Sequence, residues 1–291
     1  MSGLSRQIIT RPRLIRSVAL YYAIAIGWAW AVWAPLVLGV DGLKILSISP
    51  SLPVLTCIAT LGPSLGCFIT HRIETGNWAA IHLLPGTKGR WIWFLLGPLL
   101  VLICNFVVFP VFVSSGSPAL WRWHPSVLTG LWFPMFNYNL LGGPLFEEPG
   151  WRGFLQPRLE EIMHPWVAAI CVGIMWAAWH IPLFFVTWSS ASPASFLLIE
   201  IGVSILIAFA LNSAGRAILV AILMHAAFNA SSRFLDPFLG QTPTRSCPSG
   251  EMILAWAYLF VAAVIILSTR GRLRSAERKV GPFRDSRDSA L

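Results

Sequence analysis

A few ionisable and amide side chains interrupt an otherwise apolar chain, and together they could perform hydrolysis. In chain order they are Glu147, Glu148, Arg152, His180, His225 and Asn229. Cleavage of a peptide bond needs a base that activates water, donors that stabilise the tetrahedral oxyanion, and an acid for the leaving amine. Glutamate, histidine and asparagine side chains can supply all of these. Each residue also has a structural explanation, so the elements that position them decide between the two.

The two acids lie in a run rich in glycine and proline, Gly142 to Arg152. Pro149 disfavours helix at Glu148 and suits the first turn of a new helix, so we expect both acids at a helix N-terminus. The helix dipole there favours carboxylates, and Arg152 lies one turn from Glu148, within reach of an ion pair. Glu147 is then the acid without an obvious partner and the candidate base. Capping of an interfacial helix explains the same residues equally well.

The histidines lie in two later apolar stretches. Trp176 precedes His180 by one turn and Pro182 weakens the helix just after it, although a lone histidine in a membrane helix is often a packing residue. His225 and Asn229 are spaced i, i+4, so they share one helix face. Their structural alternative is an interhelical hydrogen bond worth about 0.6 to 2 kcal/mol. A bundle that hides a carboxylate and two imidazoles from lipid tends to gather them into one cavity, which favours a shared site.

Composition places these residues in a membrane protein. Of 291 residues 56% are hydrophobic and only 11% charged, with a mean hydropathy of +0.70, far from the usual composition of soluble domains. A bilayer core of about 30 Å needs about 20 apolar residues per helix. Eight stretches approach that length: 17–40, 51–71, 91–114, 127–146, 166–188, 195–212, 216–232 and 251–269. We read the first as a retained span rather than a cleaved signal.

The predicted fold is therefore an all-α, polytopic membrane helix bundle of about eight transmembrane helices. A ninth, amphipathic interfacial helix is expected over 149–164, because apolar residues recur there at helical spacing among charges. We expect one domain over residues 1–291, with the motifs in 141–232 and a disordered tail over 270–291. Glu147 would end a span near one face, whereas His180 lies about 20 Å into the next by the helical rise. The two meet only if that span begins outside the membrane or the acidic segment dips into it, and we expect both.

Charge and cysteine patterns narrow the class further. The net charge is +9, but the basic residues cluster at the termini and in short loops, which argues against nucleic acid as a partner. With eight spans, 17 of the 21 Lys and Arg fall on the side of the termini, so both ends are predicted to be cytoplasmic. The five cysteines form no CxxC pair, so neither a disulfide framework nor a thiolate metal site is indicated. Membrane lipids and a peptide or lipidated-protein substrate are the expected partners.

The polar motifs resemble those of the type II CAAX prenyl endopeptidase and bacteriocin-processing (CPBP, or Abi) family. The resemblance rests on Glu147-Glu148-x-x-x-Arg152, an aromatic-x-x-x-His ending at His180, and His225-x-x-x-Asn229, and runs from about 141 to 232. Trp176 stands where many members have Phe. The resemblance implies an intramembrane endopeptidase that acts on CAAX-type substrates or peptide precursors. By this resemblance, Glu147 and His180 would together activate the water. His225 and Asn229 would stabilise the oxyanion, and Glu148 with Arg152 would orient the site.

Members of the family are often called metalloproteases, and a zinc ion held by Glu147, His180 and His225 is the cofactor that this implies. The sequence has no HExxH, and two histidines with one carboxylate suit a zinc site and a metal-free site equally. We favour metal-free chemistry, with zinc as the alternative.

Three other interpretations remain. The string from Gly62 to Gly66 has the G-x-S-x-G pattern, which makes Ser64 a candidate nucleophile of a rhomboid-like serine protease, although close helix packing explains the glycines better. A membrane immunity or scaffold protein could keep the polar cluster for binding a peptide without cutting it. A transporter would need Glu200, but that residue lies about five residues inside its span and is expected to snorkel to the interface.

Overall fold

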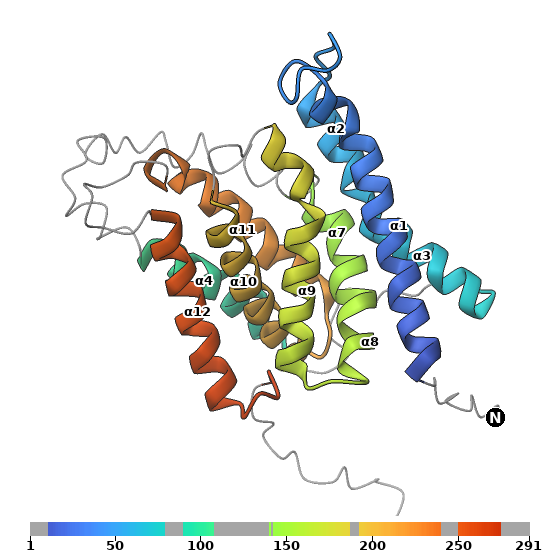
Figure 1. Ribbon diagram of the computed structural model, residues 1–291. Helices are drawn as coiled ribbons and strands as arrows, with labels where there is room; N and C mark the ends of the chain where they lie inside the picture. The colour runs from blue at the N-terminus through green and yellow to red at the C-terminus, as the bar shows by residue number, and fades with distance from the viewer. Residues whose placement is uncertain are drawn as a thin grey trace, which may run out of the picture.

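All regular structure in the described part of the chain is helical (Figure 1). The computed structural model describes residues 11–78, 90–107, 140, 142–186, 192–239 and 250–274, with the backbone alone for 107 and 232–239. The α-helices are α1 (Arg11–Leu38), α2 (Leu52–Ala59), α3 (Leu61–Thr75), α4 (Trp93–Val107), α7 (Pro144–Gly150), α8 (Gln156–Glu160), α9 (Pro165–Trp179), α10 (Pro193–Ser213), α11 (Ile218–Leu239) and α12 (Gly250–Ser268). A π-helical turn, Trp151–Leu155, joins α7 to α8, and 3-10 turns cover Arg90–Ile92 and Ile181–Phe185.

Within the described residues, five helical stretches are long and apolar enough to cross a bilayer. They are Arg11–Leu38, Leu52–Thr75, Pro165–Phe185, Pro193–Ser213 and Gly250–Ser268. Each coincides with one of the predicted spans, because a chain in lipid must satisfy its backbone within helices. The predicted spans 91–114 and 216–232 correspond to shorter apolar helices, Arg90–Phe106 and Ile218–Ser231. The predicted span 127–146 and the tail after 274 lie largely or wholly outside the described residues.

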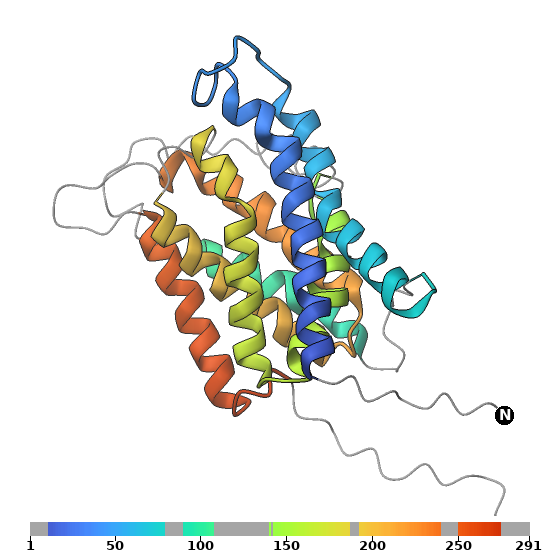
Figure 2. The same ribbon diagram turned by 45° about the vertical axis from the view of Figure 1, so that its right-hand side comes forward.

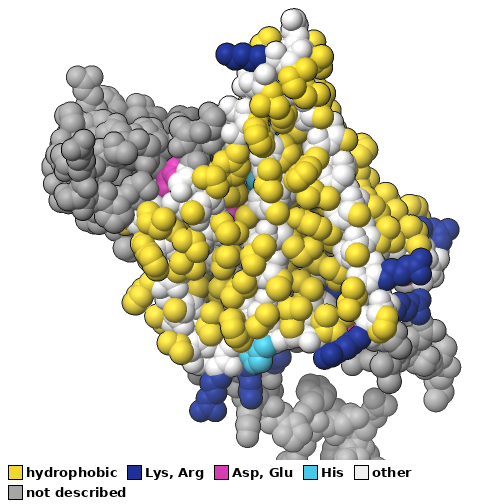
Figure 3. All heavy atoms as spheres, in the orientation of Figure 1, with side chains coloured by type: hydrophobic (Ala, Val, Ile, Leu, Met, Phe, Trp, Pro, Cys, Tyr) yellow, Lys and Arg dark blue, Asp and Glu magenta, His cyan; other side chains and the backbone are white. Residues whose placement is uncertain are grey.

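The outer surface agrees with a multi-pass membrane protein. Figure 3 shows a face that is mostly hydrophobic, with most of the visible Lys and Arg side chains gathered along its lower and right-hand edges. Large apolar side chains such as Leu267, Phe260 and Leu95 are 77%, 71% and 65% exposed. Exposed apolar side chains on this scale are unfavourable in water and suit contact with lipid.

Close contacts between backbones hold the bundle together. α10 packs against α9, α12, α11 and α4, and α1 packs against α3 (Figures 1 and 2). A Cβ added at Gly62 or Gly66 of α3 would lie 2.6 Å or 2.8 Å from a carbonyl oxygen of α1, and one at Gly173 would lie 2.7 Å from a Cα of α10. Small residues allow such approach between membrane helices. The packing role predicted for Gly62 and Gly66 is therefore confirmed.

The prediction of an interfacial helix over 149–164 is wrong. The helical run begins at Pro144, continues through Pro149 and the π turn, and ends at Glu160. Its bulky side chains are buried inside the bundle, with Trp151 and Leu155 at 0% exposure. A proline removes one backbone hydrogen bond without ending a helix that its neighbours support, and π turns accommodate the resulting irregularity. Apolar periodicity cannot distinguish a partner helix from a membrane interface.

Polar contacts anchor this run at its C-terminal end. Arg158 of α8 pairs with Glu74 of α3 at 3.3 Å and donates to Ser17 of α1 at 3.1 Å. On the other side, Glu160 pairs with Arg216 and accepts from Asn212. The segment that carries the acids is therefore fixed to α1 and α3 on one side and to the C-terminal end of α10 on the other.

Candidate active site

The two acids lie near the start of α7, in the interior of the bundle. Glu147 is 3% exposed and Glu148 is fully buried. The N-cap residue is Gly143, and a Cβ there would lie 3.0 Å from Glu147 Oε1 and 3.9 Å from Asn229 Nδ2. Glycine therefore leaves room for both polar groups. The acids lie near the start of a helix, as expected, but that helix begins at Pro144 rather than at Pro149.

Glu148 joins a cation and an imidazole. Its Oε1 accepts from Arg152 Nη1 at 2.9 Å and from His225 Nδ1 at 2.8 Å. The predicted ion pair between Glu148 and Arg152 is thus confirmed, and both side chains of the pair are fully buried. Because the His225 Nδ1–H donates to the carboxylate, the second ring nitrogen, Nε2, is the one that can face a substrate.

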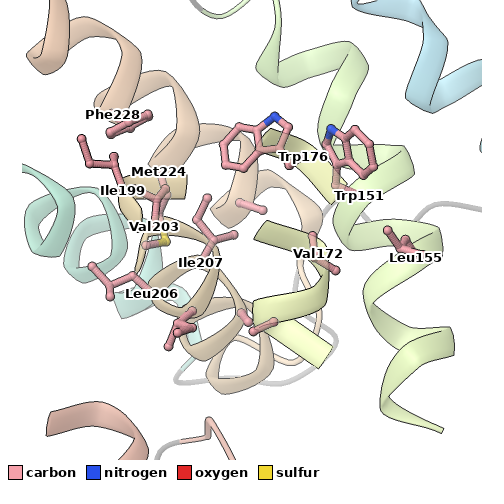
Figure 4. Close-up of a cluster of buried hydrophobic side chains, with 14 of the residues drawn as sticks. Trp151, Leu155, Val172, Trp176, Ile199, Val203, Leu206, Ile207, Met224 and Phe228 are labelled. Carbon is pink, nitrogen blue, oxygen red and sulfur yellow. The ribbon is translucent and has the colours of Figure 1, made fainter. Parts of the chain in front are cut away.

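Trp176 of α9 contacts most of the site. Its indole Nε1–H donates to Glu147 Oε2 at 3.0 Å, so Glu147 has a neutral donor as its partner rather than a cation. The Arg152 guanidinium lies over the Trp176 ring, 4.5 Å from its centroid, and the His225 ring packs edge-on at 4.7 Å. Figure 4 shows Trp176 at the edge of a buried apolar cluster that includes Val203. The Trp176 side chain is 1% exposed, so the cluster holds the indole in place.

His180 lies where α9 ends. It is the C-cap residue of α9, and a 3-10 turn beginning at Ile181 follows, as the weakening effect of Pro182 predicts. Its Nδ1 lies 3.0 Å from the Trp176 carbonyl oxygen. A carbonyl only accepts, so Nδ1 carries the proton and a neutral His180 has its lone pair on Nε2. The Trp179 and Phe196 rings pack edge-on against it at 4.7 Å and 5.4 Å.

The structure therefore brings together the residues that the sequence singled out. Trp176 contacts Glu147, Arg152, His225 and His180 directly, and Asn229 of α11 reaches the same N-cap region as Glu147. The acidic segment enters the bundle far enough to meet the C-terminal half of α9, as the depth argument required.

Metal binding finds no support in the donor arrangement. Among the described residues, no three His, Cys, Asp or Glu side chains form a group that could hold a metal ion. Glu147, His180 and His225 therefore do not fit a shared zinc in this arrangement, and no step below is routed through one.

Ser64 has a structural role in the packing of α3 against α7. Its hydroxyl donates to the Phe146 carbonyl oxygen. The α3 backbone at Pro63 meets α7 so closely that a Cβ at Gly150 would overlap the Pro63 carbonyl. This use of the hydroxyl supports the packing interpretation of the G-x-S-x-G string.

Sequence reasoning missed two residues. Trp176 was treated only as an aromatic before His180, although its spacing of four residues from that histidine was the available signal. Glu200 was expected to snorkel, yet it is 2% exposed inside the bundle, so that expectation is wrong. Its depth along α10 was known, but the face on which it lies could not be read from hydropathy.

Comparisons with known proteins agree with this site. Residues 128–231 match the family model described as "Type II CAAX prenyl endopeptidase Rce1-like". Over 183 residues the chain is 27% identical to a protein of Methanococcus maripaludis named "CAAX prenyl protease 2". That alignment covers 60% of this chain and 63% of the relative, so the matched part spans less than two thirds of its length.

Fold and site together define a multi-pass membrane helix bundle with a buried carboxylate–imidazole centre. Every site residue from Glu147 to Asn229 falls inside the matched segment. Through residues 128–231, the chain matches the Rce1-like type II CAAX prenyl endopeptidase (CPBP) family, whose members are intramembrane proteases.

Proposed function

We propose that this protein is an intramembrane endopeptidase that hydrolyses a peptide bond with a water activated by Glu147. The observation that carries the proposal is that the two acids have different partners. Glu148 holds Arg152 and His225, whereas the buried Glu147 accepts, among the described residues, only from the Trp176 indole. A carboxylate without a cationic partner retains the basicity that a general base needs.

The proposed chemistry uses side chains of this chain alone. Glu147, helped by the lone pair on His180 Nε2, takes a proton from water as the water oxygen attacks the scissile carbonyl carbon. Asn229 Nδ2–H donates to the oxyanion in every protonation state. His225, held by its Nδ1 hydrogen bond to the Glu148 carboxylate, is the second oxyanion-stabilising residue of the proposal. The proton then passes to the amide nitrogen, the C–N bond breaks, and a carboxylate and an amine are released.

The proposed substrate is a prenylated protein of the CAAX type, on the strength of the family and of the relative's name. A bacteriocin or another peptide precursor needs the same chemistry and is the alternative substrate. We place the cleavage near the cytoplasmic side with both termini cytoplasmic, as the distribution of Lys and Arg favours.

The test is cleavage by purified protein in lipid nanodiscs, with fragments identified by mass spectrometry. The panel contains a farnesylated CAAX peptide, the same peptide without the lipid, and a precursor-like leader peptide. We expect wild type to cut the farnesylated peptide, Glu147→Gln to be inactive, and Glu161→Gln, the same change at an exposed glutamate, to match wild type. Cleavage should persist with a metal chelator, because the described His, Cys, Asp and Glu side chains form no group that could hold a metal ion.

Two results would overturn the proposal. Glu147→Gln that cuts as fast as wild type would remove Glu147 from the chemistry. A wild type that binds the peptides and leaves them intact would instead support the non-proteolytic immunity or scaffold interpretation.

A further inference from the structure

The backbone carbonyl of Trp179, at the end of α9, receives no hydrogen bond from its own helix. Such a carbonyl normally accepts from the N–H four residues later in an α-helix, or three residues later in a 3-10 turn. Here the third residue is Pro182, which has no N–H, and the Leu183 N–H donates instead to the His180 carbonyl at 2.9 Å. Inside a membrane bundle, a backbone group that proline frees in this way needs a partner from a neighbouring helix.

α1 supplies that partner. The indole Nε1–H of Trp30 donates to the Trp179 carbonyl oxygen at 3.0 Å. The contact is reciprocal, because the Trp179 indole donates to the Ala25 carbonyl oxygen of α1 at 3.2 Å. Further down the interface, the Tyr22 hydroxyl donates to the Met175 carbonyl oxygen at 2.9 Å. Three side-chain hydrogen bonds therefore join α1 to the C-terminal end of α9, and the two helices lie beside each other in Figure 2.

The rings at this contact also surround His180. The Trp179 ring packs edge-on against the imidazole with 4.7 Å between centroids. The Trp33 ring of α1 packs against Trp179 at 4.7 Å and lies nearly parallel to the imidazole at 6.4 Å. The orientation of His180 therefore depends on where α9 ends and on how α1 holds that end. α1 lies outside the segment 128–231 that matches the family model, so this support comes from another part of the chain.

We propose that Trp30 is a positioning residue for His180. By donating to the carbonyl that Pro182 frees, Trp30 fixes the point at which α9 ends. It thereby fixes the place of the imidazole that helps Glu147 to activate water in the proposed reaction. The structural part, that Trp30 holds the end of α9, is independent of the proposed function. The effect on cleavage rests on that function.

The structural part is tested by amide hydrogen exchange in detergent micelles, followed by mass spectrometry on a peptide that covers residues 180–186. Trp30→Phe keeps an aromatic ring and removes the N–H. Trp28→Phe is the matched control, because both indoles are 39% exposed and Trp28 donates to the carbonyl oxygen of Ile58, near the end of α2, at 2.8 Å. We expect exchange to be roughly two- to tenfold faster in Trp30→Phe, the value of one hydrogen bond, and unchanged in Trp28→Phe. Unchanged exchange in Trp30→Phe, or an equal increase in both variants, would overturn the inference.

The effect on the site is tested by the cleavage assay described above. We expect Trp30→Phe to lower kcat about tenfold with KM changed by less than about twofold, because a reacting group is displaced while peptide binding is kept. Trp28→Phe should match wild type. If Trp30→Phe does not fold, Trp30→benzothienylalanine takes its place, since it keeps the bicyclic ring and replaces only the N–H by sulfur. A wild-type kcat in the variant that lacks the Trp30 N–H, or an equal loss in Trp28→Phe, would overturn the positioning role. If wild type cleaves nothing, the proposed function fails while hydrogen exchange still decides whether Trp30 holds the end of α9.

Discussion

Replacing Glu148 with glutamine keeps the shape of the side chain and removes the charge that joins two partners. Its Oε1 accepts from Arg152 and His225 at 2.9 Å and 2.8 Å, and the ion pair is fully buried. Removing one partner of a buried ion pair is destabilising by about 3 to 5 kcal/mol, because the other charge is left uncompensated. We therefore expect Glu148→Gln to lower the free energy of unfolding by that amount. The glutamine amide can also donate to His225 Nδ1 and favour the wrong tautomer, so cleavage should fall as well.

The measurement is reversible unfolding by SDS in mixed micelles, which reports the free energy of unfolding directly. Glu74→Gln is the matched control, because its pair with Arg158 at 3.3 Å is partly exposed, with side chains 19% and 16% accessible. A pair that solvent screens is worth about 0 to 1 kcal/mol. Equal losses for Glu148→Gln and Glu74→Gln would refute the reasoning, because burial would then not be what makes the Glu148 pair strong.

Three further outcomes follow from the packing and the charges. Ser64→Ala should keep cleavage at the wild-type rate and lose about 0.5 to 1.5 kcal/mol in SDS unfolding, the value of one hydrogen bond; loss of cleavage with intact folding would revive the serine-protease interpretation. Gly150→Ala should lower the free energy of unfolding by about 1 to 3 kcal/mol, because the added Cβ would overlap α3. Gly153→Ala, whose added Cβ would have its nearest contact 3.7 Å away, should be tolerated. Equal effects of the two changes would contradict the close contact between α3 and α7. Glu147→Gln should be at least as stable as wild type by the same measurement, because it removes a buried acid that has no cationic partner among the residues the structure describes. A clear loss of stability would show a structural role.

Hydropathy predicted most of the fold, because lipid forces each span to satisfy its backbone in a long apolar helix. The motif spacing also predicted that Glu147, His180 and His225 lie close together, since polar side chains in a membrane bundle are buried in its interior, away from lipid. The failures share one cause. Pro149 ends a helix in isolation but not when neighbouring helices hold the backbone, and Glu200 snorkels only if its helix face reaches lipid. Both outcomes depend on tertiary neighbours, which no local pattern in the sequence encodes.

The energetics of Glu147 decide between a helix cap and a catalytic base. An acid in the first turn of a helix contributes about 0.3 to 1 kcal/mol through the helix dipole. Burial of an ionised carboxylate is unfavourable by several kcal/mol, and the ion pair that would offset it belongs to Glu148 instead. The Trp176 donor and the dipole together do not compensate for that burial. Capping therefore does not account for an acid that is 3% exposed at this position. The proposed role as a general base, at the meeting point of α7, α9 and α11, would account for it.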